Sequence, residues 1–299
     1  MDKRAGVIGV ALMLKFAATV WAGGSSETEY TWPGWRGPSG DGKTAEDPWE
    51  TTTTIDGEIV WQVDVGEGFS SVAVAGGRGY TLGNAGGNDT IYCLNVKNGK
   101  ILWEYSYPAT SGQYPGPRAT PAVAGEKLVV LSRNGDLFCF DKSNGKILWR
   151  RDLVAEEGVR TPEWDLASSP VIRDDIIYLN VNRAGMALGL DDGRVIWATE
   201  EDRCGYASPV FLDIGGSVQV IMFGKDALHG VNPDDGDIIW SFPWRTEFDV
   251  NAADPLVAGN RIFISSNYRR GCAVLEVDQD GVTALWENYE FNSHFSSFV

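Results

Sequence analysis

A short motif recurs along the chain at nearly constant spacing. The sequence NGKILW ends at Trp103 and again at Trp149, and related motifs end at Trp61 (DGEIVW), Trp197 (DGRVIW), Trp240 (DGDIIW) and Trp286 (DGVTALW). The intervals between these tryptophans are 42, 46, 48, 43 and 46 residues. A period in the forties with short strands is typical of β-propellers, in which each repeat forms one four-stranded blade.

Each motif predicts the outer hairpin of a blade. The Asn-Gly or Asp-Gly pair tolerates the positive φ that a two-residue hairpin turn requires, and β-branched and aromatic residues flank it. A second recurring element, such as RATPAVAGE (118–126) or ASSPVIRDD (167–175), opens each unit. It predicts the two inner strands, with proline at the first strand position, where a missing N–H costs least.

The predicted fold is an all-β propeller of four-stranded antiparallel blades. Five complete blades are expected at about 68–107, 117–153, 166–200, 205–244 and 250–290. An orphan outer strand precedes them around Trp61, and HFSSFV, from His294 onward, matches the opening of a sixth blade. We therefore expect an unclosed ring in a C-terminally truncated chain, with the repeats in 55–299 after a lead segment, 23–54.

The repeated tryptophans predict contacts between blades. Outer strands of neighbouring blades diverge with radius, and a large flat side chain fills that gap while its N–H finds a carbonyl. Stacking on a cofactor would require one special tryptophan instead of a repeated one. The expected blade-docking residues are Trp61, Trp103, Trp149, Trp197, Trp240 and Trp286.

The N-terminus predicts export. Positive charge in residues 1–4 precedes an apolar stretch, 5–22, so residues 1–22 are expected to be a signal peptide. Lys15 interrupts the apolar stretch, which leaves an uncleaved anchor as the alternative. The expected location is periplasmic or otherwise exported, and no later segment is long and apolar enough to cross a bilayer.

Charge and metal-ligating residues exclude several classes of function. A formal net charge of −16 makes nucleic acid a poor partner, because phosphate binding needs clusters of Lys and Arg. The four dispersed cysteines are expected to be buried free thiols, although a bridge between Cys204 and Cys272 stays open. His229 and His294 share no metal-ligand spacing, and no metal site is predicted.

The repeat resembles a known family. Residues 139–149, CFDKSNGKILW, approximate the unit Ala-x-Asp-x-x-Thr-Gly-Lys-x-x-Trp of the PQQ-like (pyrroloquinoline quinone) β-propeller repeats, with Asn144 in place of Thr. Residues 187–197 and 230–240 fit as well, and one residue is inserted in 273–286. The resemblance covers about 55–299, and WPGWRGPSGDG (32–42) looks like the lead of exported bacterial members.

The resemblance implies two classes of function. Some relatives are PQQ- and calcium-dependent quinoprotein dehydrogenases of alcohols or sugars, and others are non-enzymatic, BamB-like propellers. The alcohol dehydrogenase type commonly carries two adjacent bonded cysteines, and this sequence has no Cys-Cys pair and no haem motif. We expect a protein- or ligand-binding scaffold in the cell envelope without a cofactor, with the dehydrogenase as the alternative.

The predicted binding face consists of the loops that join each outer strand to the next inner strand. These loops gather at one end of a propeller and are rich in polar and aromatic residues here. An envelope protein or a small ligand is the expected partner, and solvated loops with local salt bridges are the alternative. The candidate residues are Arg118, Arg160, Glu163, Trp164, Asp165, Arg203, Tyr206, Arg245, Asp249, Asn251 and Asp254.

Overall fold

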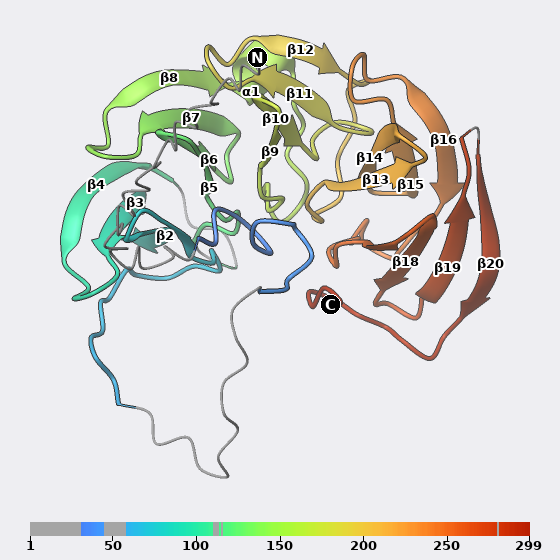
Figure 1. The fold of residues 1–299 in the computed structure, drawn as a ribbon, viewed down its shortest axis with the longest axis horizontal. Helices are drawn as coiled ribbons and strands as arrows, with labels where there is room; N and C mark the ends of the chain where they lie inside the picture. Colours follow the sequence, from blue (N-terminus) through green and yellow to red (C-terminus); the bar gives the residue numbers. More distant parts are fainter. Residues whose placement is uncertain (1–30, 45–57, 110–113, 115, 280) are drawn as a thin grey trace, which may run out of the picture.

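The fold is an arc of five β-sheets around a common centre (Figure 1). The computed structural model describes residues 31–44, 58–109, 114, 116–279 and 281–299, so the predicted signal peptide lies outside the described residues. Each sheet has four antiparallel strands that pair in chain order, as expected for propeller blades. No sheet in the described part of the chain closes the ring between blades one and five.

The strands of each blade follow one another directly along the chain. Blade one contains β1 (Ala73–Ala75), β2 (Arg78–Ala85), β3 (Asn88–Asn95) and β4 (Ile101–Pro108); blade two β5 (Ala122–Ala124), β6 (Lys127–Leu131), β7 (Asp136–Asp141) and β8 (Ile147–Asp152); blade three β9 (Val171–Arg173), β10 (Ile176–Leu179), β11 (Met186–Gly189) and β12 (Val195–Ala198); blade four β13 (Val210–Ile214), β14 (Ser217–Phe223), β15 (Ala227–Val231) and β16 (Ile238–Pro243); blade five β17 (Leu256–Ala258), β18 (Arg261–Ser266), β19 (Gly271–Val277) and β20 (Val282–Asn288). One short helix, α1 (Leu153–Glu157), follows blade two, capped by Asp152 and ended by Gly158 in the left-handed conformation.

Tryptophan and glycine lock neighbouring blades together. The Nε1 of Trp103 donates to the carbonyl oxygen of Lys142 in the next blade at 3.0 Å. Gly145 of that next turn lies under the ring, where a Cβ would be only 2.7 Å from Trp103. The same donation joins Trp61 to Val96 (2.9 Å), Trp149 to Leu190 (3.0 Å) and Trp197 to Pro233 (2.7 Å).

Two of the six tryptophans depart from this pattern. Trp240 donates instead to Gln219 of its own blade at 2.7 Å and covers Gly230 on β15. In blade five, where the motif carries an inserted residue, no ring lies over Gly281. Trp286 is 43% exposed, because no blade follows blade five in the described part of the chain.

Apolar side chains fill the spaces between blades. One cluster joins Leu137 and Cys139 of blade two to Leu179 and Leu188 of blade three, and similar clusters join the other neighbours. All four cysteines are buried free thiols, so no bridge joins Cys204 to Cys272. Within the described residues, no helix is long and apolar enough to cross a membrane.

A ladder of polar side chains surrounds the centre. The backbone N–H just before each inner strand donates to a side chain at the same position of the next blade or, after blade five, to the C-terminal segment. The bonds run from Ser71 to Thr120 Oγ1 (3.2 Å), Thr120 to Ser169 Oγ (2.9 Å), Ser169 to Ser208 Oγ (3.0 Å), Ser208 to Asp254 Oδ1 (2.7 Å) and Asp254 to Ser297 Oγ (2.9 Å). Each blade is therefore fixed to the next at the centre as well as at the outer strands.

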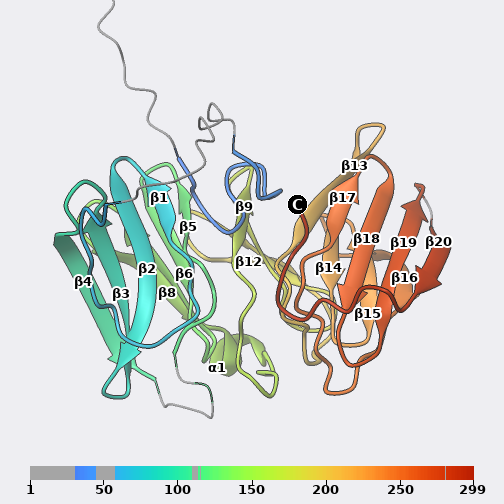
Figure 2. The same ribbon diagram turned by 90° about the horizontal axis from the view of Figure 1, so that it is seen from below.

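The lead segment, residues 31–44, crosses the centre at the end opposite α1 (Figure 2). Trp32 forms a bridge with Val74 on β1, and the carbonyl of Pro33 accepts the N–H of Val123 on β5. The indole N–H of Trp35 then donates to Asp254 before blade five at 2.5 Å. The lead thus contacts the first, second and fifth blades, on both sides of the opening.

Replacing Gly193 by alanine tests the contact between blades. Gly193 and Gly215 both have positive φ (67° and 61°), so alanine costs about 1–2 kcal/mol at either position. Only at Gly193 does the added Cβ lie 2.7 Å from Trp149, which adds about 1–3 kcal/mol of overpacking. Urea denaturation should show a larger loss for Gly193→Ala than for Gly215→Ala, and equal losses would contradict the docking role.

His229 on β15 makes stability depend on pH. Its side chain is buried, and burial lowers the pKa of the imidazole to about 4, below its ordinary value of 6.5. The neutral form therefore stabilises the fold above pH 6.5, and this contribution is lost as the pH falls toward 4, by about 3 kcal/mol in total. Urea denaturation between these pH values should show a flatter profile for His229→Gln than for the natural protein.

The second histidine provides the control. His294 is only partly buried, so His294→Gln should keep most of the loss of stability on acidification. If the free energy of unfolding of His229→Gln depended on pH as in the natural protein, other groups would cause the loss of stability on acidification.

Candidate functional site

A cavity of about 520 Å³ lies where the loops between blades meet at the centre. Four predicted residues line it, one from each of four successive loops: Arg118, Trp164, Tyr206 and Asp254. Ser169 and Ser208 of the polar ladder lie in the same wall, and Trp35 of the lead segment lies beside Asp254. Five blades and the lead therefore build one cavity from segments far apart in the sequence.

Aromatic rings form most of the cavity wall. The further aromatic lining residues are Phe69, Tyr114, Tyr268, His294 and Phe295. The ring of Trp164 lies 6.2 Å from that of Tyr206, and the ring of Tyr268 lies 5.1 Å from that of His294. Such a wall supplies a large apolar surface with a few polar atoms, which is typical of small-ligand sites.

Burial changes the acid–base behaviour of two groups in the wall. Burial raises the pKa of the Tyr206 hydroxyl to about 12, so the phenol keeps its proton at neutral pH. Burial also lowers the pKa of His294, so its imidazole is neutral there. Neither side chain brings a charge into the cavity.

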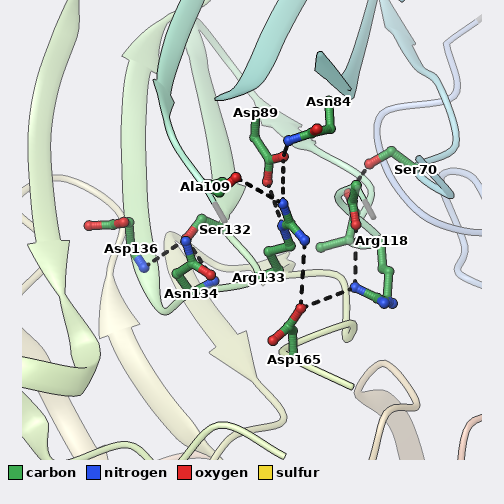
Figure 3. A network of polar contacts seen from close by, with 12 residues as sticks. Ser70, Asn84, Asp89, Ala109, Arg118, Ser132, Arg133, Asn134, Asp136 and Asp165 are labelled. Carbon is green, nitrogen blue, oxygen red and sulfur yellow. Dashed lines mark hydrogen bonds and ion pairs between the residues drawn. The ribbon is translucent and has the colours of Figure 1, made fainter. Parts of the chain in front are cut away.

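An ion-pair network holds Arg118 in place (Figure 3). Asp165 lies 3.5 Å from Arg118 and 3.8 Å from Arg133, and it adopts a left-handed backbone with φ 64°. Arg133 in turn pairs at 3.0 Å with Asp89 of blade one, and both side chains are fully buried. Asn84 donates to the same Asp89 at 2.7 Å. The network connects blades one and two to the loop that precedes blade three.

Among the described residues of the cavity wall, Asp254 is the one carboxylate. It accepts the N–H of Ser208 and the indole N–H of Trp35, and Arg36 lies 3.9 Å away. Burial raises the pKa of Asp254, and these donors and the guanidinium oppose that rise. The oxygens of Asp254 are thus engaged by the protein itself.

The other predicted residues do not line the cavity. Arg160 pairs with Glu201 at 3.7 Å, and Arg245 pairs with Asp226 at 3.2 Å, both at the exposed rim. Longer side chains on these loops reach solvent or local partners instead of the centre. The residues outside the lining are Arg160, Glu163, Asp165, Arg203, Arg245, Asp249 and Asn251.

Asn251 is buried and structural. Its Nδ2 donates to the carbonyls of Gly224, Lys225 and Trp244 at 2.9 to 3.2 Å. The backbone carbonyl of Asn251 accepts the backbone N–H of Tyr206 at 2.9 Å. Asn251 therefore positions Tyr206 in the cavity without reaching the cavity itself.

The sequence predicted only four of the fifteen described residues that line the cavity. Phe69 precedes blade one, Tyr268 lies in a turn within blade five, and Phe295 follows blade five. All three lie outside the four loops from which the binding face was predicted. Trp35 lies 219 residues from its partner Asp254, and nothing local in the sequence marks that pairing. The one available signal was the repeated polar residue before each inner strand, which aligns Ser169 and Ser208 with Asp254.

A family profile described as outer membrane protein assembly factor BamB matches residues 51–115 and 109–297. The chain belongs to this family of PQQ-like repeat propellers. BamB from Moraxella catarrhalis has a similar structure, with 16% identity and a TM-score of 0.56 over 80% of this chain and 66% of that one. Quinohemoprotein alcohol dehydrogenase from Comamonas testosteroni is also similar, with 13% identity and a TM-score of 0.63 over 89% of this chain and 51% of that one.

These similarities establish the fold alone, because the identities are low. The chain spans just under two thirds of that BamB chain and about half of that dehydrogenase. No curated protein matches the sequence. A BamB-like propeller and a dehydrogenase-like propeller therefore both remain compatible with the family, and the site has to decide between them.

The cavity does not fit a calcium–quinone centre. Calcium takes six to eight oxygen ligands, several of them carboxylates. The described wall offers a single carboxylate, Asp254, whose oxygens accept protein donors and face Arg36. No group of three His, Cys, Asp or Glu in the described residues has the geometry to hold a metal ion.

Removing Asp89 tests the network beneath Arg118. Asp89→Ala leaves the buried guanidinium of Arg133 without its closest partner, which is expected to cost about 3–5 kcal/mol of unfolding free energy. The matched change Glu200→Ala breaks the exposed pair with Arg183 and should cost less than about 1 kcal/mol. Chemical denaturation measures both, and similar small losses would show that Asp89 does not support the fold.

Proposed function

We propose that this propeller is a non-catalytic binding scaffold of the cell envelope, and that its central cavity holds a small ligand. The observation that carries the proposal is the aromatic wall of the cavity, assembled from the loops of successive blades. A cavity of about 520 Å³ lies within the range of roughly 300–1,000 Å³ that is usual for small-ligand sites.

The rigid ladder beneath the wall supports binding without catalysis. Ser169, Ser208 and Asp254 each accept a backbone N–H from the neighbouring blade, so the lower wall is fixed before a ligand arrives. No side chain in the wall is paired as a nucleophile with a general base in the described residues. These features of the wall support ligand binding over catalysis.

The matched family and the predicted export signal support the proposed envelope location. The matched family is described as an outer membrane protein assembly factor, and the composition of residues 1–22 predicts an export signal. A role beside envelope proteins is consistent with both. A protein partner would use the exposed rim, where Arg160 and Arg245 lie, and leave the cavity to the ligand.

The dehydrogenase is the alternative function. It requires PQQ and calcium, and the donors of the described wall do not fit them. Adding PQQ and calcium with ethanol or glucose should give no reduction of an electron-accepting dye. Turnover would overturn the scaffold proposal.

Filling the cavity tests the ligand site with the neutral dye Nile red. The natural protein is expected to bind the dye at one saturable site, since the apolar wall excludes water. Binding is followed by the change in Nile red fluorescence. Ala252 lines the cavity, and Ala252→Trp should abolish this change because the indole occupies the space. Ala258→Trp places the same ring on the exposed end of β17 and should bind the dye normally.

Circular dichroism of both variants checks that the fold is intact. Equal dye binding by Ala252→Trp and Ala258→Trp, or no saturable binding by the natural protein, would overturn the proposed ligand site.

A further inference from the structure

The charges in the cavity wall are already paired within the protein. Arg118 lies 3.5 Å from Asp165 and stacks over the ring of Phe69 at 5.6 Å. Asp254 accepts two N–H donors and has Arg36 3.9 Å away. A charged ligand would lose its hydration without gaining a free partner of opposite charge. The wall therefore favours a neutral ligand.

Hydroxyl groups in the wall keep a proton to donate. The Oγ atoms of Ser169 and Ser208 accept backbone N–H groups at 2.9 and 3.0 Å. The hydroxyl of Tyr206 accepts the backbone N–H of Trp164 at 3.4 Å. A hydroxyl has one donor besides its two acceptor sites. In the described part of the chain none of these three protons has an acceptor, so each remains for a ligand oxygen.

His294 adds an unpaired polar atom to the wall. Its Nε2 is buried and has no hydrogen-bond partner among the described residues. Buried polar atoms of this kind normally have a partner, so a ligand that supplies one is favoured here. The cavity thus offers several neutral hydrogen-bonding groups close to aromatic surface.

The rings do not form a flat slot, because the one near-parallel pair in the described wall, His294 and Phe295 at 23°, is in direct contact at 3.7 Å and leaves no space between its rings. The planes of Trp164 and Tyr206 meet at 51°, and those of Tyr268 and His294 meet at 86°. Phe248 at the rim stands at 81° to Trp164. Rings at different angles can contact C–H groups on several sides of one ligand, whereas a flat aromatic ligand can stack on only one of these rings at a time.

We infer that the cavity binds a neutral carbohydrate of one or two sugar rings, an inference that rests on the proposed ligand site. A pyranose ring presents C–H groups that pack against aromatic faces and hydroxyls that pair with Ser169, Ser208, Tyr206 and His294. The volume of about 520 Å³ accommodates such a ligand. The partner class is thus uncharged and rich in hydroxyls.

Calorimetric titration of the full chain with cellobiose and with maltose tests the inference. At least one of them is expected to bind at a single site. Trp164→Ala should weaken that affinity about tenfold, because the sugar loses a ring face. Trp286→Ala removes an exposed tryptophan outside the cavity and should leave the affinity unchanged.

Tyr206→Phe separates hydrogen bonding from ring contact. It keeps the ring and removes the hydroxyl, so sugar affinity should fall about three- to tenfold while Nile red binding stays the same. A loss of both would point to a disturbed wall, which circular dichroism detects, and unchanged sugar affinity would contradict the role of the hydroxyl.

Three further probes distinguish the ligand classes: choline for cations, glucuronate for anions and 2-naphthol for flat aromatics. Saturable binding of one of these without binding of either disaccharide would overturn the carbohydrate inference and leave the ligand site standing. Absence of disaccharide binding at millimolar concentrations would also overturn it. If the natural protein bound neither a disaccharide nor Nile red, the proposed ligand site itself would be overturned.

Discussion

The structure depends on the contact between a tryptophan of one blade and a turn glycine of the next. A Cβ at Gly145 or Gly193 would lie 2.7 Å from the ring of Trp103 or Trp149. Positive φ and the covering ring both require glycine there, so the Asn-Gly or Asp-Gly turn and the tryptophan form one unit across the blade boundary. Repeat proteins gain stability from such contacts between neighbours, and an unclosed arc is compatible with that arrangement.

The cavity follows from this order at the outer strands. Once the outer strands are fixed, the loops between blades have to converge at the centre, and the polar ladder from Ser71 to Ser297 sets their spacing. Side chains just outside the ladder, such as Trp164 and Tyr206, then face one another. The rim residues diverge from the centre, which explains why charged residues of the same loops form local pairs in solvent.

The sequence predicted the blades well because each blade is encoded locally. The turn, the flanking strands and the tryptophan lie within a few residues of one another, and the structure confirms the all-β propeller of four-stranded blades. The site was predicted only in part. Asn251 and Asp254 are three residues apart in one loop, yet Asn251 caps buried carbonyls and Asp254 lines the cavity. Whether a loop side chain turns inward depends on the neighbouring blades, which local pattern does not contain.

Asp254 explains where the lead segment binds. The other acceptors in the polar ladder are hydroxyls of Ser or Thr, and a single hydroxyl oxygen has two acceptor sites. A carboxylate has two oxygens with about four acceptor sites in total. Asp254 can therefore accept from the backbone N–H of Ser208 and from the indole N–H of Trp35 while it faces Arg36. With serine at this position, the Trp35 indole and the Arg36 guanidinium would have no anion to contact. One exchange of hydroxyl for carboxylate thus attaches the lead to blade five and brings Trp35 into the cavity wall.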